Sequence, residues 1–111
     1  MHRTQKYLTI LVLAASTAAL SAADASAIWQ KTCQKCHGAD GKGQTKIGQK
    51  LSITDMTDAK VQAGFTDDEA FTALKSGLKD KEGKIRMKPA EGVSDDEIKS
   101  LVAYVRTLKG K

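Results

Sequence analysis

The sequence predicts a small all-α domain. Two segments begin with the pattern of a capped helix, Thr66-Asp67-Asp68-Glu69 and Ser94-Asp95-Asp96-Glu97, and apolar residues follow each at helical spacing. An earlier segment, from Ala25 to Cys36, shows the same spacing and contains no glycine or proline. No stretch of useful length alternates apolar and polar residues as a half-buried strand would. We therefore expect three to five helices.

Residues 1–23 have the composition of a cleavable leader. Arg3 and Lys6 make a positive start, an apolar run follows, and small residues continue through Ala23. We place cleavage before Asp24, and the tripeptides that end at Ala25 and Ala27 also fit. The alternative is an uncleaved membrane anchor, but the apolar run is interrupted by Ser and Thr and falls short of roughly 20 residues. The sequence predicts export to the periplasm, with 24–111 as one domain.

Removing 23 of the 111 residues leaves 88, which can bury only a modest core unaided. The 18 basic residues lose two with the leader, so 16 bases face 13 acids and the net charge is +3. The lysines are spread along the chain with few aromatics among them, which argues against nucleic-acid binding. A mildly positive surface suits an acidic protein partner, although scattered lysines also serve simply as a solvated surface.

The first helix, within 25–36, carries Ile28, Trp29, Thr32 and Cys33 at helical spacing. The next stretch, 38–50, contains four glycines and many polar residues, so we expect a loop. A short helix is expected over 57–63. After Thr66, a helix places Phe71, Leu74 and Leu78 on one side, and Gly77 supplies its stop.

The last helix begins after Ser94 and is the most regular segment. Val93 precedes the cap and is expected to pack on Ile98 as a hydrophobic staple. An apolar stripe follows, with Tyr104 beside it: Ile98, Leu101, Val102, Val105 and Leu108. Three basic residues are expected to face water on this helix: Lys99, Arg106 and Lys109.

The pentapeptide Cys33-Gln34-Lys35-Cys36-His37 carries the chemistry of the chain. Two cysteines three apart can each add to a haem vinyl group, and the histidine that follows is then held against the iron. Cys33 and Cys36 are the only cysteines, and His37 is the only histidine outside the leader. We therefore predict one haem c per chain, attached through Cys33 and Cys36, with His37 as an axial iron ligand.

Two other interpretations of the pentapeptide fit the sequence less well. A short-loop disulfide or a thioredoxin-like redox pair would need strands around it in a βαβ unit, and the sequence shows none. A structural zinc site needs four ligands, and no second Cys/His pair exists in the chain.

Met87 is the predicted sixth iron ligand. A methionine sulfur raises the reduction potential and blocks other ligands from the iron, which makes the iron an electron relay. Pro89 follows Met87 by two residues and keeps this stretch out of a helix, so that an irregular segment can bend towards the iron. Met56 is the other thioether, close to an expected helix start, where its ordinary role is packing.

These features resemble a small bacterial class I cytochrome c: the Cys33–His37 motif, Met87-Lys88-Pro89 and a closing helix through Tyr104. The resemblance implies that fold, three to five helices wrapped around one covalently bound haem. It also implies that the first and last helices cross closely, with Trp29 and Tyr104 near the crossing. Ala25 stands where the family often has glycine.

One departure concerns the proton on the His37 ring. Many members of the family have a proline after a glycine in the loop that follows the haem motif, and its carbonyl accepts this proton. The comparable stretch here, 47–51, has no proline. A weaker hydrogen bond from the His37 ring would shift the reduction potential of the haem iron. The sequence does not identify the acceptor of this proton.

The expected function is electron transfer by a monomer that meets its redox partners transiently, without enzymatic activity. No catalytic constellation is present, because the one imidazole is committed to iron and the acids cluster at helix starts. The alternatives are a haem peroxidase or gas-binding module with an open sixth site, and an electron-entry subunit of a membrane complex.

Overall fold

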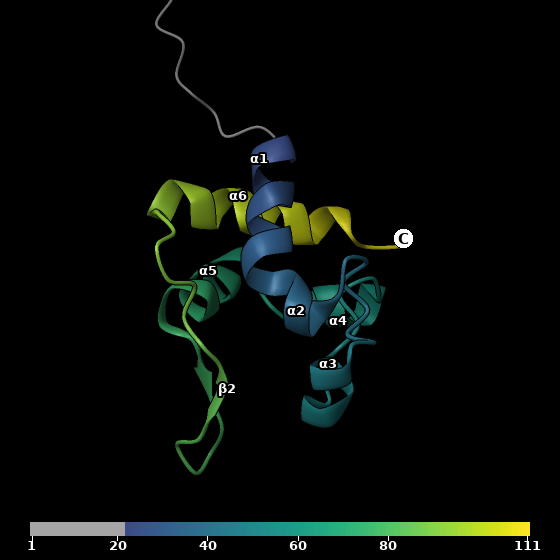
Figure 1. Ribbon diagram of the computed structural model, residues 1–111, viewed down its shortest axis with the longest axis vertical. Helices are drawn as coiled ribbons and strands as arrows, with labels where there is room; N and C mark the ends of the chain where they lie inside the picture. Colours follow the sequence, from purple (N-terminus) through teal and green to yellow (C-terminus); the bar gives the residue numbers. More distant parts are fainter. Residues whose placement is uncertain (1–21) are drawn as a thin grey trace, which may run out of the picture.

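The computed structural model describes residues 22–111, and the helical prediction is confirmed for them. One continuous helical run opens the fold and consists of α1 (Ala22–Ile28), η1 (Trp29–Cys33) and α2 (Gln34–His37). Four helices follow and bring the described chain to five helical segments: α3 (Lys46–Leu51), α4 (Ala59–Ala63), α5 (Asp67–Ser76) and α6 (Asp95–Thr107). A hairpin of β1 (Leu78–Lys79) and β2 (Ile85–Met87) separates α5 from α6 (Figure 1).

Most of the predicted leader, 1–21, lies outside the described residues, and the expected boundary before Asp24 falls within α1. In the part of the chain that is described, no helix is both long and apolar enough to cross a membrane.

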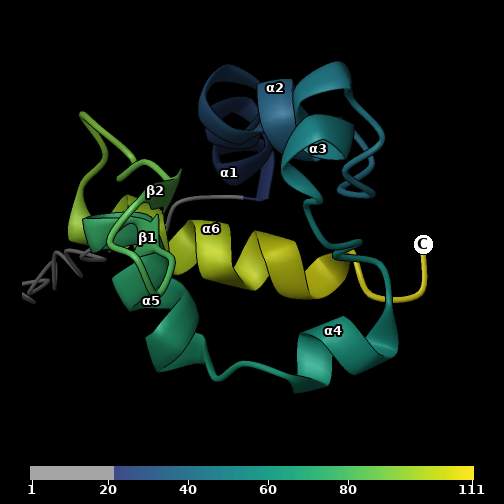
Figure 2. The ribbon, with the colours of Figure 1, turned by 90° about the horizontal axis from the view of Figure 1, so that it is seen from below.

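The core forms where the N-terminal run crosses α6. Figure 1 shows α1 passing in front of α6, and in Figure 2 α6 lies between α1–α3 on one side and α4–α5 on the other. Trp29, Leu101 and Leu108 form the buried cluster, and Ala25 is buried as expected at the crossing. The predicted stripe on α6 is confirmed, because its buried residues are Ile98, Leu101 and Val102.

Both predicted capping boxes are present. The Thr66 and Ser94 hydroxyls accept the N–H groups of Glu69 and Glu97, and those carboxylates accept the N–H groups of Thr66 and Ser94 in return. Each box satisfies donors that the first helical turn leaves without partners. Val93, the expected staple residue, packs against the core cluster. The short helix expected over 57–63 is α4, which is capped by the Asp58 side chain.

The prediction that 38–50 is entirely a loop is wrong, because its end forms α3. Thr45 caps this helix, since its hydroxyl accepts the Gly48 N–H at 2.8 Å. Gly48 weakens the helical pattern in the sequence but is required by the packing: a Cβ there would lie 2.3 Å from the Gly43 carbonyl oxygen and 2.6 Å from that of Cys36. Close approach of three backbone segments therefore overrides the low helix propensity of glycine.

The hairpin is a second difference. Met87 was expected in an irregular segment, but it is the last residue of β2 and pairs with Leu78 across the two-stranded sheet. Gly77 ends α5 as predicted, and the turn that follows is closed by Asp80, whose carboxylate accepts the N–H groups of Glu82 and Lys84. Strands of two and three residues with mostly exposed side chains leave no alternating pattern in the sequence.

Arg106 corrects the expectation that it faces water. Its guanidinium donates to the Gln62 side-chain oxygen at 3.0 Å and to the Phe65 carbonyl at 2.7 Å, and it stacks 4.3 Å from the Phe65 ring centroid. It also pairs with Asp67 at 2.8 Å. Gln62, only 4% exposed, donates in turn to the carbonyls of Met56 and Val105. This network fastens the α4–α5 connection to α6.

Candidate functional site

The helix that leads to the pentapeptide widens by one residue just before it. In η1 the Gln34 N–H donates to the carbonyl of Trp29, five residues earlier, as in a π-helix. The predicted helix is thus continuous, but a spacing argument based on 3.6 residues per turn did not reveal this turn. Such turns are rare and often occur at functional sites. Cys33 lies at the end of η1, and Cys36 and His37 lie in α2.

Cys33 and Cys36 are free, partly buried thiols. Burial, followed by the proximity of Cys36, raises the pKa of the Cys33 thiol to about 11. Redox-active CxxC pairs of the thioredoxin kind have a lowered thiol pKa, because the thiolate is their nucleophile. This environment therefore disfavours the disulfide-exchange alternative.

The His37 side chain is half-buried, and this partial burial lowers its pKa, so the neutral imidazole that binds metals is favoured. Among the described residues, its Nδ1 is the buried side-chain polar atom without a hydrogen-bond partner. Such atoms are rare and call for an explanation. The Gly48 carbonyl, in the stretch where an acceptor was sought, instead accepts the N–H of Ile53 at 2.9 Å. The described chain therefore supplies no hydrogen-bond acceptor or donor to this ring nitrogen.

Trp29 packs against the His37 imidazole. Its indole Nε1 donates to the Gly38 carbonyl at 3.0 Å, and its ring lies 5.5 Å from the His37 ring centroid and 5.5 Å from that of Tyr104. The predicted aromatic pair at the helix crossing is therefore also the contact that links the core to the histidine. The signal in the sequence is that a buried tryptophan needs an acceptor for its one donor.

Thr45 is a site residue that sequence reasoning missed. Its hydroxyl donates to the Cys36 carbonyl at 2.6 Å while it caps α3, and the Gly43 N–H donates to the His37 carbonyl at 2.8 Å. These bonds hold α3 and the glycine-rich loop against the pentapeptide. A threonine before a short helix is a capping signal, but its second bond is long-range and leaves no local pattern.

The two methionines have different surroundings. Met56 packs against the core cluster, and its backbone is held on both sides, by the Gly41 carbonyl and by Gln62. Met87 is half-buried at the end of β2 and is not among the residues packed on that cluster. Met56 therefore has the packing role expected of it, and the Met87 thioether is not used by the core.

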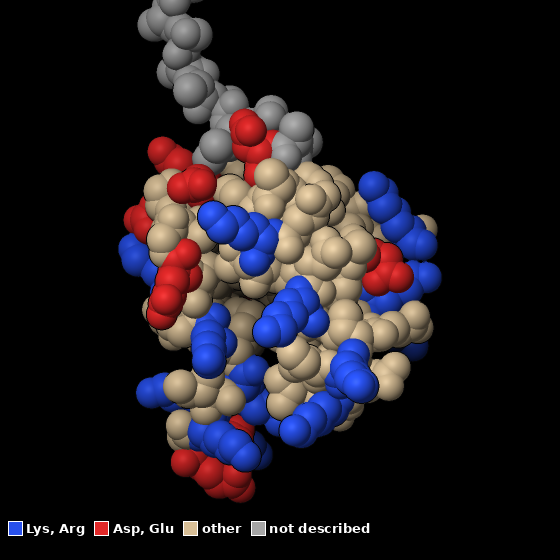
Figure 3. All heavy atoms as spheres, in the orientation of Figure 1, with Lys and Arg blue, Asp and Glu red and all other residues tan. Residues whose placement is uncertain are grey.

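The surface between α2 and the hairpin is hollowed, as Figure 3 shows, and lysine and arginine side chains gather around this hollow. The elements on its two sides carry many exposed basic residues: Lys31, Lys35, Lys46, Lys50, Lys79, Lys84, Arg86 and Lys88. The pentapeptide comes from one side of the hollow, and Met87 comes from the other side (Figure 1). The site thus combines two thiols, an imidazole, a thioether and a basic rim.

Comparison with known proteins identifies the family in which this set of donor groups occurs. The profile of the cytochrome c family matches residues 22–109, which include the pentapeptide and Met87. The chain belongs to the cytochrome c family.

Its relatives in this family are bacterial. A cytochrome c2 of Rhodospirillum rubrum is 33% identical over 86% of this chain and 88% of its own length. A cytochrome c-553 of Helicobacter pylori is 30% identical over 95% of this chain and 99% of its own length. Among solved structures, the c-type cytochrome KustC0563 superposes with a TM-score of 0.65 at 29% identity, over 77% of this chain and 96% of that one.

Family membership confirms the expected class I cytochrome c fold, haem binding and electron transfer. With two cysteines in the whole chain, the protein has a single haem c site of the CxxCH type. The residues described above fit that group, because thiols, a neutral imidazole and a thioether are the donors that haem c uses. Cytochromes c are typically electron carriers and not enzymes, and bacterial ones are typically exported.

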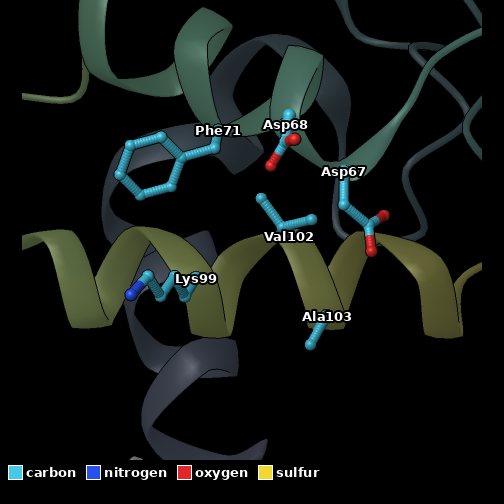
Figure 4. A pocket seen from close by; sticks show the side chains of 6 residues that line it. All are labelled: Asp67, Asp68, Phe71, Lys99, Val102 and Ala103. Carbon is cyan, nitrogen blue, oxygen red and sulfur yellow. The ribbon is translucent and has the colours of Figure 1, made fainter.

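A separate pocket lies between α5 and α6. It measures about 380 Å³ and is lined by Asp67, Asp68, Phe71, Lys99, Val102 and Ala103. Figure 4 shows it as a cleft between α5 and α6, with the Phe71 ring and the Val102 side chain lining it. No thiol, imidazole or thioether lines it, so we do not associate it with the haem.

Proposed function

We propose that the protein is a periplasmic electron carrier whose haem is bonded to Cys33 and Cys36 and held axially by His37 and Met87. When bound, the haem would supply one-electron chemistry between the ferric and ferrous states, with these four side chains holding it in both. The observation that carries the proposal is the His37 imidazole that follows two free thiols and whose buried Nδ1 has no hydrogen-bond partner among the described residues.

Each residue has a defined task in this proposal. The thiols fasten the group to the helical run, Trp29 holds the imidazole in orientation through its ring contact, and burial keeps that imidazole neutral. Met87 closes the sixth site with a soft sulfur, which raises the potential and excludes external ligands.

Replacement of each methionine by alanine tests the ligand assignment. Met87→Ala should leave haem attached, abolish the charge-transfer band of methionine-ligated ferric haem, lower the potential and let imidazole bind. Met56→Ala is the matched control and should weaken folding while leaving that band in place, because Met56 packs on the core. Loss of the band in Met56→Ala alone would move the assignment to Met56. A high-spin ferric spectrum in the unaltered protein would favour an open sixth site, as in a peroxidase or gas-binding module.

We further propose that redox partners are acidic proteins that dock transiently on the basic rim of the hollow, with the carrier acting as a monomer. Small, charged redox interfaces bind weakly and are screened by salt. Electron-transfer rates with an acidic partner should fall as ionic strength rises, and rates insensitive to salt would contradict the electrostatic part.

Mass measurement of the exported protein tests the leader: cleavage before Asp24 predicts a mature chain of 24–111 plus one haem.

A further inference from the structure

Arg86 joins the hairpin to α3. Its Nη2 donates to the carbonyl oxygen of Leu51 at 3.0 Å, although the two residues are 35 apart in the sequence. The donor belongs to β2 and is the immediate neighbour of Met87, and the acceptor is the last residue of α3. Of the described residues, no other hydrogen bond or ion pair joins α3 to the hairpin.

The acceptor is suited to a cation. The last carbonyls of a helix have no partner within the helix and carry partial negative charge. Ser52, which follows α3 in a left-handed conformation with φ 52°, returns its N–H to Gln49 and Gly48 and leaves the Leu51 carbonyl for Arg86. A guanidinium can reach such an oxygen from a distance while its other donors stay in water.

The acceptor is also firmly tied to the pentapeptide. Thr45, the cap of α3, donates to the Cys36 carbonyl, and the absence of a Cβ at Gly48 lets α3 pack directly on that same carbonyl. A hydrogen bond to the end of α3 therefore also restrains the hairpin relative to the segment that carries Cys36 and His37.

On the donor side, one peptide unit separates Arg86 from Met87, so fixing one residue restricts the other. Successive side chains of a strand point to opposite faces, so the bond made by Arg86 does not compete with the Met87 thioether. The hairpin has little else to hold it in place, since Leu78 and Ile85 are 49% and 57% exposed.

We propose that Arg86 is a positioning residue for Met87: its bond to Leu51 clasps the hairpin to the pentapeptide side of the site and slows departure of the sulfur from the iron. This inference rests on the proposed function, because it requires Met87 to be the sixth ligand.

The test compares three variants of the haem-loaded protein by the rate at which imidazole binds the ferric form. Arg86→Gln should speed imidazole binding about fivefold, the effect of ~1 kcal/mol for one charged hydrogen bond. Lys84→Gln removes the same charge from the same hairpin, where the structure gives the Lys84 side chain no partner, and should stay within about twofold of the unaltered protein. Arg86→Lys should fall between them.

Three results would overturn the proposal. Equal rates of imidazole binding in Arg86→Gln and Lys84→Gln would mean that the loss of a positive charge explains any change and that the hydrogen bond to Leu51 has no effect. A lower denaturant midpoint in Arg86→Gln with an unchanged imidazole rate would mean that Arg86 supports the fold but does not position Met87. If Met87→Ala keeps the charge-transfer band of the unaltered protein, the ligand assignment itself fails and the clasp fails with it, whatever Arg86 does.

Discussion

The two sides of the haem site are held in different ways. The helix crossing, where η1 meets α6, is built from side chains that are almost fully buried, and Leu101 and Trp29 are 0% and 3% exposed. The hairpin that carries Met87 contributes no residue to the buried cluster and exposes its own apolar side chains. The comparison teaches that this small cytochrome anchors the segment that leads to Cys33 in its core, whereas Met87, the proposed sixth ligand, lies on a weakly packed arm.

This division has a physical reason. Two thioether bonds and an imidazole must be held in fixed relative positions, and close packing does this best because it is not continuously deformable. Met87, the proposed sixth ligand, needs only to be brought within reach and kept there. Two hydrogen bonds and one close contact hold its segment: the Arg86 bond, the bond from the Ala90 N–H to the Leu74 carbonyl, and the close approach of Met87 to Gly77.

The largest expected effect comes from breaking the crossing. Trp29→Ala should lower the free energy of unfolding by about 3–5 kcal/mol, because it removes a buried aromatic side chain, together with the bond to Gly38. Trp29→Phe keeps an aromatic ring but loses the five-membered part of the indole and its N–H donor, so it should cost roughly 1–3 kcal/mol. Denaturant unfolding of the haem-loaded variants measures both. Equal losses would mean that the hydrogen bond, and not ring packing, dominates at this position.

A smaller effect is expected on the arm, where two glycines form a matched pair. Gly77 and Gly83 have nearly the same positive φ, 78° and 81°, but a Cβ at Gly77 would lie 2.5 Å from the Met87 carbonyl oxygen, whereas one at Gly83 meets nothing within 4 Å. Gly83→Ala should cost about 1–2 kcal/mol for the left-handed backbone alone, and Gly77→Ala roughly 1–3 kcal/mol more.

The two glycine variants also separate in the spectrum. Only Gly77→Ala should weaken the methionine charge-transfer band, because only there does the added methyl group displace the Met87 backbone. A band unchanged in both variants would show that the arm absorbs the clash elsewhere and that the path of the chain at Gly77 does not set the position of the ligand.

The smallest of the three effects tests whether the core around α6 and the hairpin that carries Met87 are independent of each other. Gln62→Ala leaves the carbonyls of Met56 and Val105 without their donor and should cost about 2 kcal/mol of folding free energy. The exposed neighbour Lys60→Ala should cost less than about 0.5 kcal/mol. Neither variant should change imidazole binding. Faster binding in Gln62→Ala would show that the core network and the Met87 arm are coupled, contrary to the division drawn here.

The sequence revealed those parts of the fold whose cause is local. Each capping box occupies four consecutive residues, and the stripe on α6 repeats at helical spacing, so both could be predicted and both are confirmed. The assignment of α3 failed because the need for Gly48 comes from two distant carbonyls. Arg106 was misjudged for the same reason, since its partners lie about 40 residues earlier in the chain.

The candidate site also has parts that the sequence reveals and parts that only the folded chain reveals. The pentapeptide is contiguous, so its chemistry is visible in the sequence, and membership of the cytochrome c family confirms the haem c site. The roles of His37 and Met87 as iron ligands stay predictions. The contacts that surround them, from Trp29 to Gly38, from Thr45 to Cys36 and from Arg86 to Leu51, join residues 9 to 35 positions apart and could be found only in the folded chain.

The wide turn η1 limits how the length of this chain can change. A hydrogen bond that spans five residues accommodates one residue more than an ordinary helical turn, and every residue in a helix rotates its successors by about 100°. Deleting a single position between Trp29 and Cys33 would let the turn close as an α-helix and would keep the direction of the residues that follow, whereas one further insertion would exceed what the wide turn absorbs and would swing both sulfurs away from the indole. Insertions should therefore be tolerated at the hairpin tip around Gly83 but not in this short stretch, where residue count sets the angular phase of the thiols relative to the core.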